Sequence, residues 1–157
     1  MKKNMLLVLA FGTMLSLAAC FTEPDQILDE VSWVEFQQTI VSTPAVGRTY
    51  PFLAFARAMP GVRTTQVNLV GAQRATDTPI NFVVDEASTA VAGTHYKLSG
   101  NTFSIPANTS FGQCGIEVLN APRDSGKTVD VVLRLEQSGD IKASENYRRI
   151  GFRINLN

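Results

Sequence analysis

The chain has 157 residues, of which 14 are basic and 14 are acidic, and 45% are hydrophobic. This length leaves room for one domain with a buried core, and the absence of a basic patch argues against nucleic acid as a partner. The sequence has no G-x-S-x-G, no H-E-x-x-H, no Cys/His ligand spacing and no glycine-rich phosphate loop, so it does not predict an enzyme.

Residues 1–20, MKKNMLLVLAFGTMLSLAAC, open with Lys2 and Lys3 and continue as an apolar run. This pattern is typical of a secretory signal, and the run is shorter than the about 20 residues that a membrane span needs. It closes on Leu17-Ala18-Ala19-Cys20, which resembles the lipobox of bacterial lipoproteins. The resemblance implies that residues 1–19 are a lipoprotein signal peptide and that Cys20 is the lipidation site. The alternative is an ordinary secretory signal that happens to end at a cysteine.

Lipidation would give Cys20 a diacylglycerol on its thiol and an acyl chain such as palmitate on its freed amine. Two or more acyl chains hold a protein stably on a membrane, whereas one does not. We therefore expect a lipid-anchored outer-membrane protein that faces either the periplasm or the cell surface. Loss of residues 1–19 removes Lys2 and Lys3 and leaves a formal charge of −2.

Residues 21–31, FTEPDQILDEV, are acidic and contain Pro24. Together with Cys20 they are interpreted as a tether, residues 20–31, that lets the domain stand off the membrane. Acidic residues directly after the lipidated cysteine resemble the export signals of some Bacteroidota surface lipoproteins.

The other reactive side chains have structural interpretations. Cys114 is the one cysteine besides Cys20, and lipid on Cys20 would leave it without a cysteine partner, so no intrachain disulfide is expected. It lies in the strand-like stretch FGQCGIEVL with no base in view, which favours a buried, inert thiol over a nucleophile. Glu117 and Glu136 also lie in strand-like stretches and are interpreted as solvated positions rather than as a catalytic carboxylate pair.

Residues 32–157 are predicted to form one β-sandwich domain, because the apolar residues recur with period two and no segment has a convincing amphipathic helical pattern. Turn clusters such as Met59-Pro60-Gly61 separate the runs. About eight short strands indicate an all-β, antiparallel sandwich. The expected strand ranges are 31–37, 49–58, 64–72, 79–85, 101–106, 111–119, 127–137 and 148–156.

A polar stretch, VAGTHYKL at 91–98, interrupts this pattern and holds the one histidine, His95. Ala92-Gly93-Thr94-His95-Tyr96, followed by IPAN at 105–108, resembles the Calx-beta type of immunoglobulin-like sandwich. It resembles more closely the Calx-beta-like domains of unknown function in Bacteroidota lipoproteins, over about residues 80–136. The resemblance implies a non-catalytic sandwich, and relatives of this kind often accompany outer-membrane nutrient-uptake systems.

The stretch is predicted to be a structural corner made by Gly93, Thr94 and Tyr96. Gly93 permits a tight bend, and Thr94 can tie its hydroxyl to nearby backbone. Tyr96 can bury its ring and send its hydroxyl to a main-chain acceptor. His95 would then point outward. The alternative, a catalytic His95, needs a nucleophile or an orienting acid that the sequence does not supply.

Calcium is an alternative ligand because some Calx-beta domains bind it. Ca²⁺ takes about 6–8 oxygen ligands, and the acidic loop residues here are few: Asp85, Glu86, Asp124 and Asp140. The loop NAPRDSGK at 120–127 has one aspartate beside two basic residues. We therefore predict no metal and no cofactor, with calcium kept as the less favoured alternative.

Two functions remain. One is a non-catalytic lipoprotein domain that contacts a protein or glycan partner, accessory to an uptake system; the other is a carbohydrate-binding module of a glycan-uptake system. An exposed aromatic platform on one sheet face or loop end would favour the second, although most aromatic residues in such strands belong to the core. The candidate rings are those of Trp33, Tyr50, Phe52, Phe55 and Phe111.

Overall fold

The computed structural model describes residues 31–56 and 59–157; the proposed lipidation site Cys20, the signal peptide and most of the tether lie outside the described residues. The described chain contains ten strands and one helix of five residues, α2 (Gln37–Val41). No helix in this part of the chain is long and apolar enough to cross a membrane. The strands are β1 (Trp33–Phe36), β2 (Phe52–Ala56), β3 (Gly61–Val70), β4 (Thr78–Val84), β5 (Tyr96–Lys97), β6 (Thr102–Ile105), β7 (Phe111–Val118), β8 (Thr128–Leu135), β9 (Lys142–Ala143) and β10 (Arg149–Asn155).

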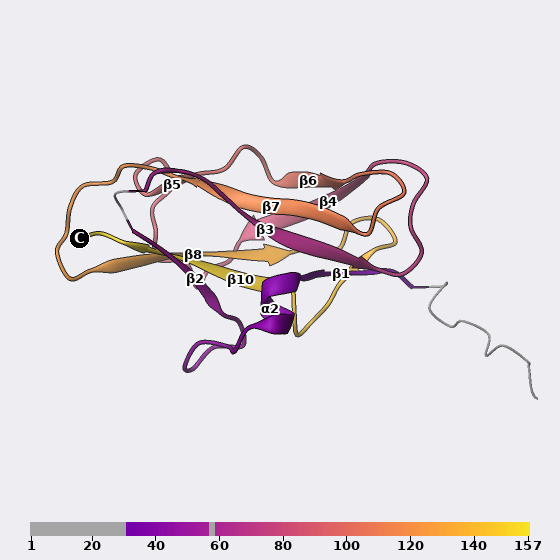
Figure 1. Ribbon diagram of the computed structural model, residues 1–157, viewed down its shortest axis with the longest axis horizontal. Helices are drawn as coiled ribbons and strands as arrows, with labels where there is room; N and C mark the ends of the chain where they lie inside the picture. The colour runs from indigo at the N-terminus through magenta and orange to yellow at the C-terminus, as the bar shows by residue number, and fades with distance from the viewer. Residues whose placement is uncertain (1–30, 57–58) are drawn as a thin grey trace, which may run out of the picture.

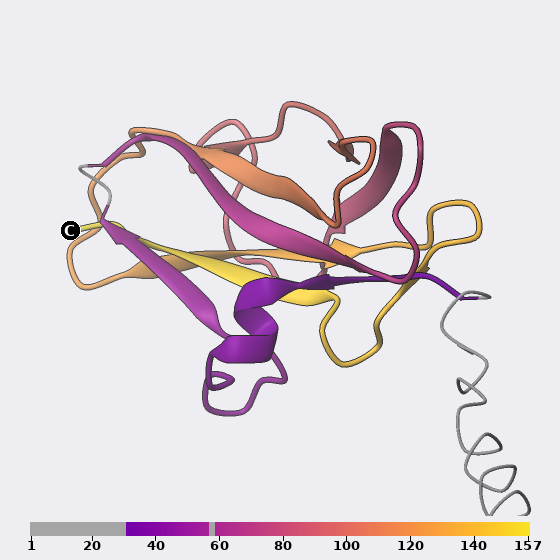
Figure 2. The ribbon, with the colours of Figure 1, turned by 45° about the vertical axis from the view of Figure 1, so that its right-hand side comes forward.

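The strands form two five-stranded sheets that pack face to face (Figure 1, Figure 2). Sheet A has the order β5-β7-β3-β1-β9, and sheet B has the order β2-β10-β8-β4-β6. The predicted all-β sandwich is confirmed, with ten strands rather than about eight. The two additional strands, β5 and β9, have two residues each and are too short to show a period of two.

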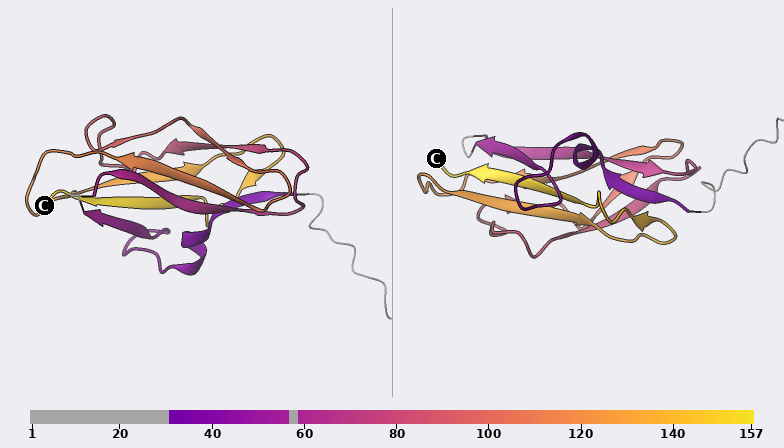
Figure 3. Two further views of the ribbon diagram at one scale, coloured as in Figure 1. Left: turned by 45° about the horizontal axis from the view of Figure 1, so that its top comes forward. Right: turned by 90° about the horizontal axis from the view of Figure 1, so that it is seen from below.

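Most strand pairs are antiparallel, but β1 pairs with β9 and β2 pairs with β10 in parallel. These two parallel pairs arise because the N-terminal part of the chain contributes β1 to sheet A and β2 to sheet B. Figure 3 (right) shows β1, α2 and β2 following one another along this side of the molecule. The Phe36 amide donates to the Tyr147 carbonyl at 2.9 Å, and the Thr39 hydroxyl donates to the Arg149 carbonyl at 2.6 Å. This segment therefore links β1 of sheet A to β10 of sheet B and to the residues that precede it.

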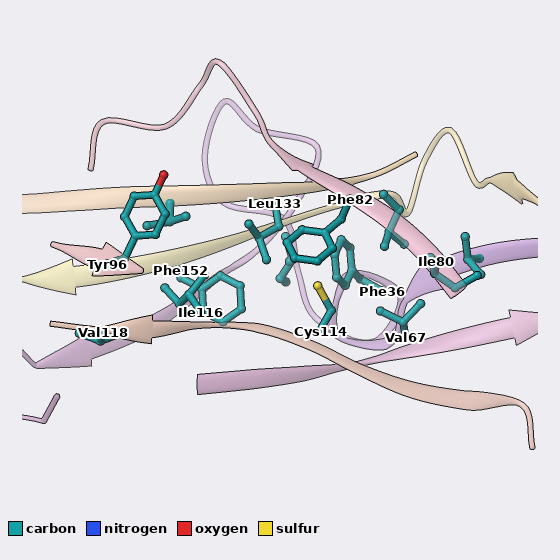
Figure 4. Close-up of a cluster of buried hydrophobic side chains, with 14 of the residues drawn as sticks. Phe36, Val67, Ile80, Phe82, Tyr96, Cys114, Ile116, Val118, Leu133 and Phe152 are labelled. Carbon is teal, nitrogen blue, oxygen red and sulfur yellow. The ribbon is translucent and has the colours of Figure 1, made fainter. Parts of the chain in front are cut away.

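The core lies between the inner faces of the sheets (Figure 4). Alternate residues of each strand point into it, as a half-buried antiparallel sheet requires. The side chains buried there are almost entirely aliphatic or aromatic, and they include Val34, Phe36, Val67, Leu69, Ile116, Val118, Leu133, Leu135, Ile150, Phe152 and Ile154. The opposite residues of the same strands are left on the outer faces.

The backbones of β3 and β7 approach each other closely at Gly115. Gly115 pairs with Thr64, and a Cβ at Gly115 would collide with the Arg63 carbonyl oxygen and lie 2.8 Å from the Thr64 Cα. Both obstructing atoms belong to the backbone, which cannot rotate away as a side chain can. Any residue larger than glycine must therefore push the two strands apart.

We expect Gly115→Ala to lower the free energy of unfolding by about 1–3 kcal/mol, as overpacking commonly does. Gly100→Ala is the matched control, because a Cβ there would meet nothing within 4 Å. The control should change stability by less than about 1 kcal/mol. Urea unfolding of both variants measures the difference, and equal stabilities would contradict the close approach.

Candidate functional site

The outer face of sheet A carries two exposed aromatic rings separated by polar side chains. Trp33 on β1 is 37% exposed and Phe111 on β7 is 56% exposed. Both point outward, since Val34 beside Trp33 and Gly112 beside Phe111 are buried. We call this surface the sheet A face and define it by the outward residues Trp33, Glu35, Gln66, Asn68, Val70, Phe111 and Gln113.

Strand register sets the arrangement of this face. Phe111 lies opposite Asn68, and Asn68 lies opposite Glu35, so the three side chains form a row across β7, β3 and β1. Trp33 lies two residues from Glu35 along β1. With strands about 4.8 Å apart and a rise of about 3.3 Å per residue, the Trp33 and Phe111 backbones are about 12 Å apart. The two rings therefore lie on either side of Asn68 and Val70 rather than touching each other, since Val70 lies opposite Trp33. Asn68 forms the polar centre of the face together with Gln66 and Gln113.

Asn68 is held at that centre by its neighbours. The Gln66 Nε2 donates to the Asn68 Oδ1 at 2.9 Å, and the Asn68 Nδ2 donates to the Gln37 Oε1 at 2.6 Å. Burial raises the pKa of Glu35, and a hydrogen bond with the Asn68 side chain opposes that rise. An amide fixed in this way presents its remaining hydrogen-bonding capacity in one orientation.

Charges on the outer surface of the sheet A strands are balanced. The outward acidic residues are Glu35 and Glu117, and the outward basic residues are Lys97 and Lys142. Lys97 lies opposite Glu117 in the register of β5 and β7. The Lys142 Nζ lies 5.4 Å from the centre of the Trp33 ring, a distance at which a cation and an aromatic ring attract each other. The surface therefore has no single sign of charge with which to attract a polyanion or a polycation.

The other three candidate aromatic residues lie elsewhere. Tyr50 is buried, and Phe52 packs on it edge to face with ring centres 5.6 Å apart. Phe55 stacks on the core residue Phe152 at 6.1 Å. Only Trp33 and Phe111 of the five predicted candidates are exposed on one face. The polar residues between them were not predicted, although the alternation in TTQVNLV places Gln66 and Asn68 on the side opposite Val67 and Leu69.

The stretch at 91–98 folds into a tight corner that leads into β5. Gly93 has a φ of 78°, and its amide donates to the Tyr96 carbonyl at 2.8 Å. The His95 Nδ1 accepts a hydrogen bond from the Val91 amide at 2.8 Å, so the ring closes the loop in which it lies. The Leu119 amide donates to the His95 carbonyl at 3.0 Å and ties the corner to the end of β7.

Tyr96 is buried at 5% exposure and points into the core, and burial raises the pKa of its hydroxyl (Figure 4). The expected hydrogen bonds from the hydroxyls of Tyr96 and Thr94 to the main chain are absent within the described chain. The corner depends instead on backbone bonds, on the His95 ring and on the packing of the Tyr96 ring. Gly93, Thr94 and Tyr96 thus lie together, but not with the predicted side-chain bonds.

Three of the four acidic loop residues considered as calcium ligands, Asp85, Asp124 and Asp140, are paired with cations. The buried Asp85 carboxylate accepts from the Arg149 Nε at 2.9 Å and lies 3.4 Å from the Arg134 guanidinium. Asp124 pairs with Lys127 at 2.8 Å, and Asp140 pairs with Arg74 at 2.7 Å. No three His, Cys, Asp or Glu side chains within residues 31–56 and 59–157 are grouped so that they could hold a metal ion.

The remaining reactive groups are separated. Glu117 lies on β7 in sheet A, whereas Glu136 follows β8 in sheet B and pairs with Arg134 at 2.8 Å, so the two carboxylates do not face each other. Cys114 is 2% exposed and points into the core (Figure 4). Burial raises the pKa of its thiol to about 12, so the thiol stays protonated and is not a nucleophile at neutral pH.

Comparison with solved structures identifies the fold as Calx-beta-like. The apo form of the Calx CBD1 domain matches 80% of this chain and 97% of its own, with a TM-score of 0.58 and 17% identity. The Calx CBD2 domain matches 80% of this chain and 88% of its own, with a TM-score of 0.52 and 10% identity. CBD12 from CALX1.2 matches 78% of this chain and 43% of its own, with a TM-score of 0.56 and 16% identity.

At these identities the likeness shows the fold alone. No family model matches the sequence, and no curated protein matches it. The Calx-beta-like resemblance expected from residues 92–96 and 105–108 is thus supported at the level of the sandwich.

We expect the corner to respond to substitution through packing. Tyr96→Ala should lower the free energy of unfolding by about 3–5 kcal/mol, because it leaves a cavity. Tyr96→Phe should change it by less than about 0.5 kcal/mol, since the hydroxyl makes no hydrogen bond to the described chain. His95→Ala should cost about 1 kcal/mol through loss of the bond from the Val91 amide. Chemical denaturation measures all three, and a Tyr96→Phe variant as unstable as Tyr96→Ala would contradict this ranking.

Asp85 should make stability depend on acid pH. Burial alone would raise its pKa, but hydrogen bonds from the Ala87 amide and Arg149, with the charges of Arg149 and Arg134, together lower it. A lowered folded-state pKa means that the ionised form stabilises the fold. This contribution is complete above the ordinary aspartate pKa of about 3.9 and is lost as pH falls through the folded-state value.

Asp85→Asn should therefore cost about 1.5–3 kcal/mol at pH 7, the range for hydrogen bonds to charged groups. It should also lose less stability than the wild type when the pH is lowered through that window. Asp124→Asn is the control, since that ion pair is at the surface, and it should keep the wild-type pH profile. Unfolding free energies measured across the acid range test this prediction. Parallel pH profiles for wild type and Asp85→Asn would contradict a stabilising role of the ionised Asp85 carboxylate.

Proposed function

We propose that this chain is a non-catalytic lipoprotein, anchored to the outer membrane through lipid on Cys20, whose β-sandwich is an interaction domain accessory to a nutrient-uptake system. The observation that carries the anchor is the sequence LAAC at 17–20, preceded by a charged start and an apolar run. It precedes the first described residue of the domain by a short acidic segment. Two or more acyl chains on Cys20 would give the stable attachment that one chain does not.

The shape of the domain supports a role in contacting a partner. The described chain enters the sandwich at one end of its long axis, and the C-terminus lies at the other end (Figure 1). The sheet A face lies near the entry end, since Trp33 is two residues from the first described residue, and it points outward from the sandwich toward a partner. This face is the interaction surface in our proposal.

Calcium binding is not part of the proposed function. One of the structural neighbours is described as a calcium binding domain, CBD12 of CALX1.1. In the present chain the loop residues Asp85, Asp124 and Asp140 each have an arginine or lysine as their partner. A calcium ion would have to displace these cations before it could gather its oxygen ligands.

A second candidate, a carbohydrate-binding module of a glycan-uptake system, is favoured by one observation. Trp33 and Phe111 place two exposed rings on the same sheet face, and an exposed aromatic platform is the feature expected of a sugar-binding surface.

We expect Cys20→Ala to abolish the incorporation of labelled palmitate and to leave a precursor that is either uncut or cut elsewhere and released. Cys114→Ala is the matched control, because its thiol is buried, and it should remain labelled and membrane-bound. Labelling and membrane fractionation in the producing bacterium measure both variants. Unchanged labelling and processing of Cys20→Ala would disprove the lipid anchor.

A further inference from the structure

We infer that the ligand of the sheet A face is a neutral oligosaccharide, which lies across β7, β3 and β1 with its sugar rings on Phe111 and Trp33 and its hydroxyl groups on the amides between them. This inference rests on the proposed interaction domain and names the ligand class of its surface. It follows from the order of chemical groups along the face: a ring, a centre in which the Asn68 amide lies beside Val70, and a second ring.

The apolar parts of the face suit the flat faces of sugar rings. Exposed aromatic rings offer large, rigid apolar surfaces at little cost in conformational entropy. The about 12 Å between the Trp33 and Phe111 backbones is wider than one sugar ring. A linked chain of sugars can reach both aromatic residues, whereas a monosaccharide can cover only one of them.

The polar centre suits hydroxyl groups. A sugar hydroxyl both donates and accepts a hydrogen bond. The Asn68 Nδ2 already donates to Gln37 and Glu35, so Asn68 offers the remaining acceptor capacity of its Oδ1 to a ligand. Asn68 is held in place by Gln66 and Gln37, so little further ordering is needed when a ligand binds. Gln113 is exposed, and its side chain makes no hydrogen bond to the described chain, so its amide remains open to the ligand.

Other partner classes fit this face less well. Protein interfaces usually have an apolar centre and a polar rim, whereas here amides stand beside Val70 at the centre and the large rings lie outside it. Nucleic acid and anionic lipid call for clustered lysine and arginine, and the outward charges of sheet A are instead balanced between two acidic and two basic residues. The same balance favours a neutral sugar chain over an acidic one.

The chain contains one tryptophan, so emission that is excited selectively from tryptophan reports on Trp33 alone. The experiment uses the full chain in a zwitterionic detergent without a sugar headgroup. It is titrated with hexasaccharides of glucose, mannose and xylose, and with a galacturonic acid hexasaccharide as the charged comparison. We expect a saturable change in Trp33 emission with at least one neutral hexasaccharide. No saturable change with any of them, or binding of the acidic hexasaccharide alone, overturns the inference.

Variants locate the binding on the face. Phe111→Ala and Gln113→Ala change exposed side chains, and each should weaken binding of the same hexasaccharide, Phe111→Ala by about tenfold or more. Val91→Ala is the matched control, because Val91 is 55% exposed, as Phe111 is 56% exposed, but lies in the corner before β5, at the far end of β7 from Phe111. Its affinity should stay at the wild-type value.

Thermal melting of each variant shows that the fold is retained. Equal affinities for Phe111→Ala and wild type overturn the inference. Because palmitate labelling is measured separately, loss of the glycan result would leave the lipid anchor standing, and loss of the anchor would leave the glycan result standing.

Discussion

The register of β3 between β1 and β7 is the constraint on which both the core and the candidate binding face depend. In this register Val67 and Leu69 enter the core, while Gln66 and Asn68 face outward. A slip of one residue would exchange the two sets and bury two amides, at a cost of about 1–3 kcal/mol for each unpaired group. Gly115 adds a second constraint, because the approach of β7 to Arg63 and Thr64 leaves no room for a side chain there. The packing that stabilises the sandwich is thus the same packing that places the polar centre of the face between its two rings.

Most of the fold could be predicted because alternation along a strand depends on local sequence. Each of the eight predicted ranges overlaps a strand of the structure. The elements that escaped prediction have little local pattern: β5 and β9 have two residues each, and α2 has five. The parallel pairs β1–β9 and β2–β10 join segments that are far apart in the sequence, so they depend on how the N-terminal chain crosses from one sheet to the other. Nothing in a short sequence window specifies such a crossing.

The candidate site was harder to predict than the fold because burial is decided by neighbours. Phe52 and Trp33 both point away from the core between the sheets, yet Phe52 is covered by Tyr50 and the Arg153 guanidinium, whereas Trp33 stays exposed. A period of two assigns both rings to outer faces and cannot tell which one a connecting segment will cover. His95 shows the same limit: its outward direction could be predicted, but the bond from the Val91 amide to its ring depends on the path of the loop.

A flat face of this kind has consequences for how a membrane-anchored domain would use it. The sheet A face is a strand surface and not a deep pocket, so a bound sugar chain would keep much of its own surface in water, and the affinity of one domain would be modest. Lipid anchoring changes this balance, because many copies held on one membrane meet a polymeric glycan at a high effective concentration. Binding of a second and third copy then becomes nearly intramolecular, and the combined attachment can exceed that of a single domain by about 10² or more. The proposed anchor at Cys20 and the shallow, preorganised face around Asn68 would therefore suit each other, since an exposed strand surface gains most from being displayed in many copies.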